Sequence, residues 1–385
     1  MLCFIRSTGA LALATALTSI TVPCVAQIAV SGNDGKAILD NGVTKVISGI
    51  PDTVAVIDLS ARPPKLLAEI EAPASVVGPP LSVAVAPDES YALVTSAMKA
   101  GGTDQVPDNR ISVIDLKSTP PRVVATVEAG AGVAGISINK AGTLALAANR
   151  SEGTVSVFTI ANRTLTPVAK IKLGDEKSGP SHVAITPDGA MALVTRDGDS
   201  KISVLSISGN TVEYTKRDIH AGIRPYGIDI CGGGTIAVVA NIGMGGGDAD
   251  TVSVIDLTLK PPRVVDTLTV GQTPEGLACS PDGKFLALTV MNGSNKPSNS
   301  PFRADRGDVQ VWRVEGRKLV KAGEAKVGNW SQGAVFSSDN RTLVVQNMVQ
   351  KELQVFDISA SGELKDTGAP IKLKAGPAGI RTAAH

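Results

Sequence analysis

The sequence predicts an all-β protein built from seven repeated units, and two observations carry this prediction. A strand-like segment of the type Val-Ser-Val-Ile-Asp-Leu recurs seven times, with its central valines at positions 56, 113, 157, 204, 254, 311 and 355. Three further β-branched runs, separated by Pro-Asp-Gly or asparagine-rich turns, accompany each copy, and no helical period of useful length appears. Four strands in each of seven repeats predict a seven-bladed β-propeller of four-stranded antiparallel blades, because one blade cannot bury both of its faces alone.

The amino-acid composition excludes some classes of propeller and of binding partner. The 385 residues include only 6 Phe, 3 Tyr and 2 Trp, so the blades are not of the kind that needs a tryptophan in each repeat. The hydrophobic fraction of 43% supplies a large core and excludes global disorder. With 37 Lys and Arg against 36 Asp and Glu, the chain lacks the charge excess that nucleic acids or anionic membranes attract, and we expect neither as a partner.

A secretory signal peptide is expected at residues 1–26. Arg6 precedes an apolar run over 10–22, and the small-residue end of the segment predicts cleavage after Ala26. A membrane anchor fits less well because threonines and a serine interrupt the run, and the residues before Cys24 lack the usual lipidation pattern. We therefore expect a periplasmic or secreted monomer, without a membrane span, in which residues 27–385 form one propeller domain.

The two ends of the mature chain are expected to meet in one blade. Residues 376–383 read as an inner strand that lacks its partner, and residues 31–42 resemble the missing turn and second strand. We predict that residues 376–383 form the inner strand of a blade whose other three strands come from residues 36–73. Such a closure protects the last free sheet edges of the ring.

Four segments of the repeats share one strand pattern: Ala-Leu-Val-Thr at 92–95 and 192–195, Leu-Ala-Leu-Ala-Ala-Asn at 144–149 and Ile-Ala-Val-Val-Ala-Asn at 236–241. They resemble the namesake strand of the YVTN family of β-propellers, with Ala, Leu or Val in place of the tyrosine, and this family is related to the lactonase-type and surface-layer propellers. The resemblance covers essentially the whole mature chain and implies the propeller fold. It implies no single activity, because the superfamily includes lactone hydrolases, redox-partner subunits and proteins without known chemistry.

Three long insertions separate second and third strands of their blades: Ala97–Arg110, Gly243–Asp250 and Met291–Gly307. In a propeller these loops open on the same face as the connections from one blade to the next. Loops of this length on a rigid scaffold form either a binding rim or tolerated surface growth, and we favour the rim.

Residues near the start of each inner strand should line the channel mouth on that face. Reading the repeats in register gives Leu81, Ala134, Ser181 with His182, Arg224 with Tyr226, Glu275, Trp330 with Gln332, and Ala378, with Arg381 deeper. Convergent polar groups at such a mouth are the default ligand site of a ring. We expect ligand contacts from Arg224, Tyr226, Trp330, Gln332 and Arg381. Glu275 and His182 are the candidate catalytic acid and base.

Structural roles for the same residues stay open. His182 can be a histidine that bonds a neighbouring loop, Glu275 a turn residue paired with Arg224, and Trp330 a side chain packed under a loop. The three histidines of the sequence stand in separate contexts and no Cys-x-x-Cys-His motif occurs, so we expect no metal and no cofactor.

Cys231 and Cys279 fall at the ends of inner strands in successive blades. An oxidising compartment would permit a disulfide, provided that the two strands approach closely enough. The bridged and the free states both remain open at this point.

Two functions are compatible with these observations. The favoured one is an exported binding or scaffold propeller that holds an unknown small molecule, a glycan or a periplasmic protein partner at its loop-rich face. The alternative is a lactone hydrolase with Glu275 and His182 as acid and base and Arg224 as the clamp for an anionic substrate. The small number of histidines favours the first, because lactonase-type propellers commonly carry several in their inner-strand motifs.

Overall fold

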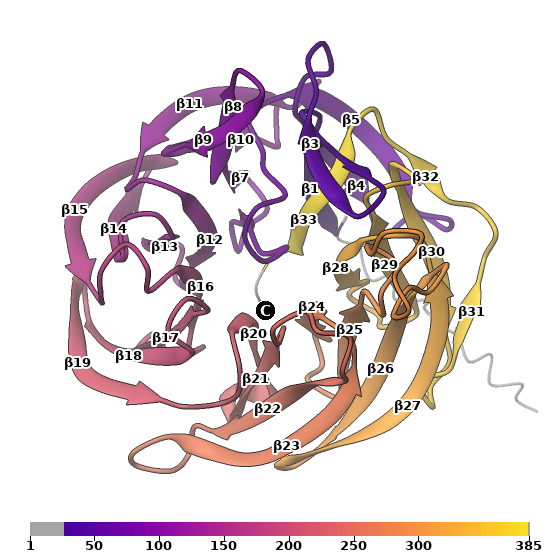
Figure 1. The fold of residues 1–385 in the computed structure, drawn as a ribbon. Helices are drawn as coiled ribbons and strands as arrows, with labels where there is room; N and C mark the ends of the chain where they lie inside the picture. The colour runs from indigo at the N-terminus through magenta and orange to yellow at the C-terminus, as the bar shows by residue number, and fades with distance from the viewer. Residues whose placement is uncertain (1–26, 384–385) are drawn as a thin grey trace, which may run out of the picture.

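A computed structural model describes residues 27–383 of the chain and shows seven antiparallel sheets arranged around a central axis (Figure 1). The seven-bladed, all-β prediction is therefore confirmed. The expected signal peptide at residues 1–26 lies outside the described residues. Within residues 27–383, none of the helical segments has the length and hydropathy of a membrane span.

Six blades follow one another along the chain, each starting with its inner strand. Their strands are β6 (Val83–Val85), β7 (Tyr91–Thr95), β10 (Arg110–Asp115) and β11 (Arg122–Glu128); β12 (Val133–Ile138), β13 (Leu144–Asn149), β14 (Thr154–Ala161) and β15 (Thr164–Lys172); β16 (Pro180–Ile185), β17 (Met191–Arg196), β18 (Lys201–Ser208) and β19 (Thr211–Ile219); β20 (Pro225–Cys231), β21 (Ile236–Asn241), β22 (Asp250–Asp256) and β23 (Arg263–Gly271); β24 (Pro274–Cys279), β25 (Phe285–Val290), β26 (Gly307–Glu315) and β27 (Lys318–Val327); β28 (Ser331–Phe336), β29 (Thr342–Asn347), β30 (Glu352–Ile358) and β31 (Leu364–Asp366). The short β32 (Ile371–Lys372) adds to β30 in the last of these.

The seventh blade joins the two ends of the chain, as expected. Its inner strand β33 (Gly376–Thr382) pairs with β1 (Ile28–Asp34), which is followed by β4 (Thr53–Asp58) and β5 (Lys65–Glu71). The predicted range of 36–73 for the three partner strands is wrong at its start, because β1 begins at Ile28. The second strand of a blade is covered on both faces, and β1 meets this requirement because it is buried almost throughout. Residues 43–46 are mostly exposed and lie in a separate hairpin, so they are not part of the blade.

The core consists of apolar clusters between neighbouring blades. The seven repeated valines of the third strands are all buried, at 5% exposure or less. Around them pack Leu, Ile, Val and Ala from both blades of each pair, for example Leu144, Leu146, Val183 and Val194 between the blades that begin with β12 and β16. Small and branched side chains thus fill the space that larger aromatic residues occupy in other propellers, which explains how so few aromatics suffice.

The two faces of the ring differ. The loop face is the one at which inner strands begin, and it carries the blade-to-blade connections, the three predicted insertions and the hairpin of β2 (Ala37–Asp40) and β3 (Val43–Val46). One insertion folds into a second hairpin, β8 (Met98–Gly101) with β9 (Asp104–Pro107). The insertion at 291–307 contacts two neighbours: Ser298 N donates to Asn41 Oδ1 of the hairpin β2–β3 at 2.7 Å, and Lys296 Nζ donates to Gly245 O of the insertion at 243–250 at 2.8 Å. The opposite turn face, where inner strands end, carries the tight turns.

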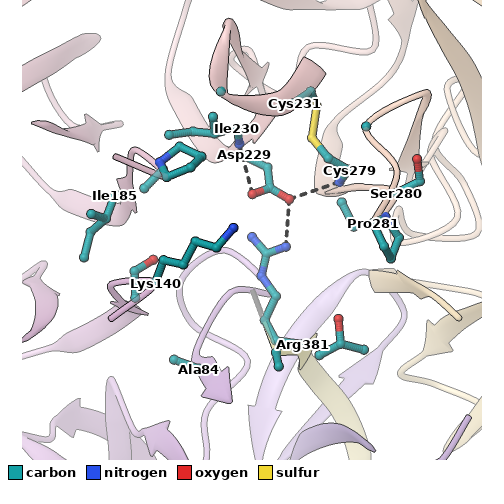
Figure 2. Close-up of a pocket in the computed structure, with 18 of the residues that line it drawn as sticks. Ala84, Lys140, Ile185, Asp229, Ile230, Cys231, Cys279, Ser280, Pro281 and Arg381 are labelled. Atoms are coloured by element: carbon teal, nitrogen blue, oxygen red, sulfur yellow. Dashed lines mark hydrogen bonds and ion pairs between the residues drawn. A yellow bond between two sulfur atoms is a disulfide. The ribbon is translucent and has the colours of Figure 1, made fainter. Parts of the chain in front are cut away.

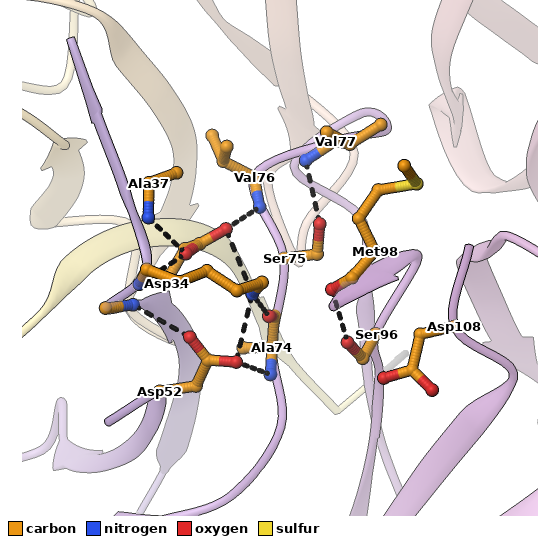
Figure 3. Close-up of polar contacts among 12 residues, drawn as sticks. Asp34, Ala37, Asp52, Ala74, Ser75, Val76, Val77, Ser96, Met98 and Asp108 are labelled. Atoms are coloured by element: carbon orange, nitrogen blue, oxygen red, sulfur yellow. Dashed lines mark hydrogen bonds and ion pairs between the residues drawn. The ribbon is translucent and has the colours of Figure 1, made fainter. Parts of the chain in front are cut away.

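Polar contacts of Asp34, Asp52 and Ala74 join the start of the hairpin β2–β3 to the connection between β5 and β6 (Figure 3). Lys36 Nζ lies 3.0 Å from Asp52 Oδ2 and 3.3 Å from Asp34 Oδ2, and it donates a hydrogen bond to Ala74 O. Val76 N donates to the same Asp34 carboxylate at 2.8 Å. The pairing of charges compensates the cost of burying them and fixes the start of the connection.

The end of that connection closes the channel. Pro79, Pro80 and Leu81 are buried, and Ile136 N and Ile380 N donate to Leu81 O and Pro80 O at 3.2 and 3.3 Å. Across the ring, a Cβ on Gly276 would stand 2.9 Å from Pro80 Cγ, so only glycine allows this approach. We call residues 79–81 the plug. It separates the channel mouth at the loop face from the part of the channel that opens at the turn face.

Candidate functional site

The register predicted for the inner strands is present in the structure. In five blades the first inner-strand residue pairs with the end of the second strand, and an irregularity follows immediately. The residues after those first positions are Ala134, Ser181, Tyr226, Glu275 and Gln332, which therefore stand at equivalent places around the mouth. Because the backbone bulges at the same point in each blade, the identity of this one residue decides what each blade contributes.

Two arginines enclose one aspartate at the mouth. Arg150 binds both oxygens of the Asp197 carboxylate, at 2.7 and 3.2 Å, and Arg224 Nη2 lies 3.1 Å from Asp197 Oδ2. Ser181 Oγ also donates to Asp197. Burial raises the pKa of Asp197, but the charge of Arg150 and these hydrogen bonds outweigh it and hold the pKa below its ordinary value. The group therefore carries one negative and two positive charges, and the Arg224 side chain keeps 39% exposure.

Glu275 is the titratable group beside this pair. It is 7% exposed, and burial raises the pKa of its carboxyl to about 8, against the opposing effects of the Gln332 hydrogen bond and the Arg224 charge. Gln332 Nε2 donates to Glu275 Oε2 at 3.0 Å. A carboxyl of this kind is mostly protonated at pH 7 and exchanges a proton near neutrality, which is the property that acid–base catalysis needs.

Tyr226 completes what we call the mouth cluster, namely Arg150, Asp197, Arg224, Tyr226, Glu275 and Gln332. The Arg150 guanidinium carbon lies 5.5 Å from the centroid of the Tyr226 ring, a cation–π distance. Burial also raises the pKa of the Tyr226 phenol, so this group stays protonated. Of the predicted site residues, the structure thus brings together Arg224, Tyr226, Glu275 and Gln332.

His182, the other candidate acid–base residue, does not lie in the mouth cluster with Glu275. His182 is the third residue of its inner strand, so it lies one step deeper than Glu275 and lines a cavity that opens at the turn face. Burial and the charge of Arg381 hold the pKa of its imidazole well below the ordinary value. Within residues 27–383 its Nδ1 has no hydrogen-bond partner.

Two other predicted ligand contacts lie elsewhere. Trp330 packs with Ala37, Val76, Met348 and Ala378 beneath the hairpin β2–β3, which is the structural role that the sequence left open. Arg381 lies near the end of β33 and forms an ion pair with Asp229 at 2.9 Å in the turn-face cavity. Neither residue belongs to the mouth cluster, because each lies at a different height along the channel axis from the second residues of the inner strands.

The turn-face cavity has a volume of about 260 Å³ and is walled by the ends of the inner strands (Figure 2). The sulfur atoms of Cys231 and Cys279 form a disulfide in its wall, with a Cα–Cα separation of 5.4 Å, which settles the question that the sequence left open. Among the described residues, no group of three or more His, Cys, Asp or Glu side chains is arranged to hold a metal ion.

Sequence reasoning missed Arg150 and Asp197. Both directly follow second strands of the YVTN-like type, β13 and β17, whereas the register analysis followed only the inner strands. Extending the register to the ends of the second strands would have found them, because those ends pair with the first residues of the inner strands.

Comparison with known proteins finds one matching family model and several similar solved structures. Residues 105–224 match the family model described as lactonase, 7-bladed beta-propeller, and this segment contains Arg150, His182, Asp197 and Arg224. No curated protein sequence matches the chain.

Similar solved structures include a putative 6-phosphogluconolactonase from Bacteroides fragilis (TM-score 0.72, 18% identity, covering 95% of this chain and 100% of that one). The periplasmic gluconolactonase of Pseudomonas aeruginosa is also similar (TM-score 0.68, 18% identity, covering 94% and 99%). A functionally unknown protein from Desulfotomaculum acetoxidans gives a TM-score of 0.68 at 15% identity, covering 93% and 99%. At these identities the likeness concerns the fold.

Proposed function

We propose that the protein hydrolyses a lactone of an anionic sugar acid at the mouth cluster. The similarity of residues 105–224 to the lactonase-type propellers supports this, and the two gluconolactonase-named structures share the fold over nearly its whole length. These findings favour the hydrolase alternative over the binding or scaffold role that the sequence favoured. Export of the chain, also a proposal, would let it meet its substrate outside the cytoplasm.

The observation that carries the proposal is the Glu275 carboxyl. Burial raises its pKa to about 8, and the charge of Arg224, which shares the Asp197 carboxylate with Arg150, acts on it. Active sites collect groups with such displaced pKa values because a proton must be taken and returned near neutral pH. The surplus positive charge suits a substrate with a carboxylate or phosphate.

Glu275 and Arg224 have separate roles in the proposed hydrolysis. Ionised Glu275 takes a proton from a water molecule as the water oxygen bonds to the lactone carbonyl carbon. Arg224, the more exposed of the two arginines, binds the anionic substrate and stabilises the oxyanion of the tetrahedral intermediate. The ring C–O bond then breaks, and Glu275 returns its proton to the departing ring oxygen. The product is the open hydroxy acid, and the carboxylate is ready for the next turnover.

The experiment is a measurement of proton release with glucono-δ-lactone and 6-phosphoglucono-δ-lactone, corrected for spontaneous opening. We expect turnover by the wild-type protein and loss of it in Glu275→Gln. The control is Glu213→Gln, which changes an exposed glutamate on β19. No turnover with either lactone, together with a ligand-induced thermal shift, would contradict the proposal and return the protein to the binding class.

A further inference from the structure

The turn-face cavity has features of a binding site in its own right. Its volume of about 260 Å³ suits a small molecule. The plug of residues 79–81 stands between it and the mouth cluster. A ligand in this cavity would therefore be a different molecule from the one bound at the loop face.

Arg381 is fixed by one hydrogen bond of its guanidinium group to a described residue. Its Nη1 binds Asp229 Oδ2 at 2.9 Å, and this is the one hydrogen bond that its guanidinium makes within residues 27–383. Both carboxylate oxygens of Asp229 also accept backbone hydrogen bonds: Ile230 N donates to Oδ1 at 3.0 Å, and Cys279 N donates to Oδ2 at 3.1 Å. The carboxylate is thus anchored to two inner strands and fixes the arginine at the cavity wall (Figure 2). The other N–H groups of the guanidinium have no acceptor among the described residues and can donate to a ligand.

Lys140 adds a second cation. It follows β12 at the cavity rim, and its side chain extends toward the Arg381 guanidinium in Figure 2. No salt bridge or hydrogen bond to a described residue occupies its ammonium group. The remaining charged side chain of the lining, Asp282, is paired with Lys284 at 3.1 Å. Because Asp229 balances Arg381 and Lys284 balances Asp282, the surplus positive charge at the cavity is that of Lys140.

The rest of the lining is apolar or neutral. Ile185, Ile230, Pro281 and the disulfide contribute apolar wall, and the imidazole of His182 is also among the lining side chains. A compact body with a carboxylate matches this combination better than a bare inorganic anion, because the apolar wall would gain nothing from the latter.

We propose that the turn-face cavity is a second binding site, for a small organic carboxylate held by Arg381 and Lys140. The ligand carboxylate accepts hydrogen bonds from both cations, and its carbon skeleton lies against Ile185, Ile230 and the Cys231–Cys279 disulfide. The site does not depend on lactone hydrolysis at the mouth cluster, since different residues on the other side of the plug carry that proposal.

The test is calorimetric titration of the full chain with succinate, with inorganic phosphate and glucose as comparison probes. Succinate should bind, and Lys140→Gln and Arg381→Lys should each weaken it about tenfold, the effect of losing one charge-assisted hydrogen bond. Arg381→Lys keeps a cation for Asp229, which guards against misfolding. Lys117→Gln, a change of an exposed lysine after β10, is the matched control and should bind as wild type.

A local readout supplements the titration. Bound succinate should slow reduction of the Cys231–Cys279 disulfide by dithiothreitol, because the ligand covers the wall that contains it. Glu275→Gln should leave both measurements unchanged while it abolishes hydrolysis, so the two proposals fail separately. The inference is overturned if succinate does not bind, if phosphate alone binds, or if Lys140→Gln and Arg381→Lys bind succinate as the wild type does.

Discussion

Gln332 Nε2 donates a hydrogen bond to Glu275 Oε2 at 3.0 Å, and the two side chains come from neighbouring inner strands, β28 and β24. Gln332 is fully buried and Glu275 nearly so. The amide therefore fixes one oxygen of a carboxyl whose proton is retained up to about pH 8. Gln332 is thus a positioning residue for Glu275.

The rate of lactone hydrolysis should rise with pH through about 8. Glu275 acts as a base only when ionised, and its raised pKa places that ionisation near 8. Initial rates from pH 6 to 9, corrected for spontaneous opening, test this. Glu275→Gln should reduce kcat/KM by about 10²–10⁴, the usual contribution of general acid–base catalysis. A wild-type profile that is flat over this range would show that Glu275 is not the base.

The same carboxyl should make stability depend on pH. Because its pKa is raised in the folded state, the folded protein binds more protons than the unfolded chain between the ordinary value of 4.5 and about 8. Its contribution is complete below pH 4.5 and is lost as the pH rises through 8. The neutral Glu275→Gln variant lacks this loss of about 4 kcal/mol, so its Tm relative to wild type should be about 5 °C higher at pH 9 than at pH 5. Equal differences at the two pH values would contradict the raised pKa.

Arg150→Ala and Arg224→Ala should separate stability from substrate binding. The Arg150 side chain is 20% exposed and binds both oxygens of buried Asp197, so its loss should cost about 3–5 kcal/mol in the free energy of unfolding. Arg224 is more exposed, and in Arg224→Ala the Asp197 carboxylate keeps its ion pair with Arg150. This variant should therefore lose under about 1 kcal/mol in the free energy of unfolding, while its KM rises. Urea unfolding and steady-state kinetics on both variants provide the check. Equal destabilisation by the two changes would refute this division.

Reduction of the disulfide should destabilise the ring. The Cys231–Cys279 bridge closes a segment with a sequence separation of 48, for which the chain-entropy estimate is about 3–4 kcal/mol. We expect the double variant Cys231→Ser, Cys279→Ser to unfold at lower urea concentration than the oxidised wild type and to match the reduced wild type. Thiol titration in denaturant without reductant should detect no free thiol at these two positions; two reactive thiols would mean that the bridge is absent.

Removal of the closing strand should be more damaging than any of these changes. β33 supplies buried Ala378 and Ile380 and pairs along β1, so a chain that ends at residue 374 leaves one blade without its inner strand. Thermal unfolding of this truncation should show a large decrease in Tm or no cooperative transition. A truncated chain with unchanged Tm would contradict the closure.

Part of the site could be predicted because it depends on the repeat. Tyr226, Glu275 and Gln332 follow the first inner-strand residue in three successive blades, and the backbone irregularity recurs at that point. Counting residues within repeats was therefore enough to place them at one mouth. The expectation failed for His182, one residue further along, because depth along the channel matters as much as the blade to which a residue belongs.

The sequence by itself determined the number of blades, the strand order within each, the closure by the two chain ends and the face that carries the long loops. These depend on local alternation and on the repeat length, which are written along the chain. Only the tertiary structure decided which charges meet. Arg150 and Asp197 enter the mouth cluster from the ends of second strands, and the plug of residues 79–81 separates that cluster from His182, Arg381 and Lys140. Such contacts join residues far apart in sequence, and their distances follow from how blades and a connecting loop pack around the axis, which no local pattern encodes.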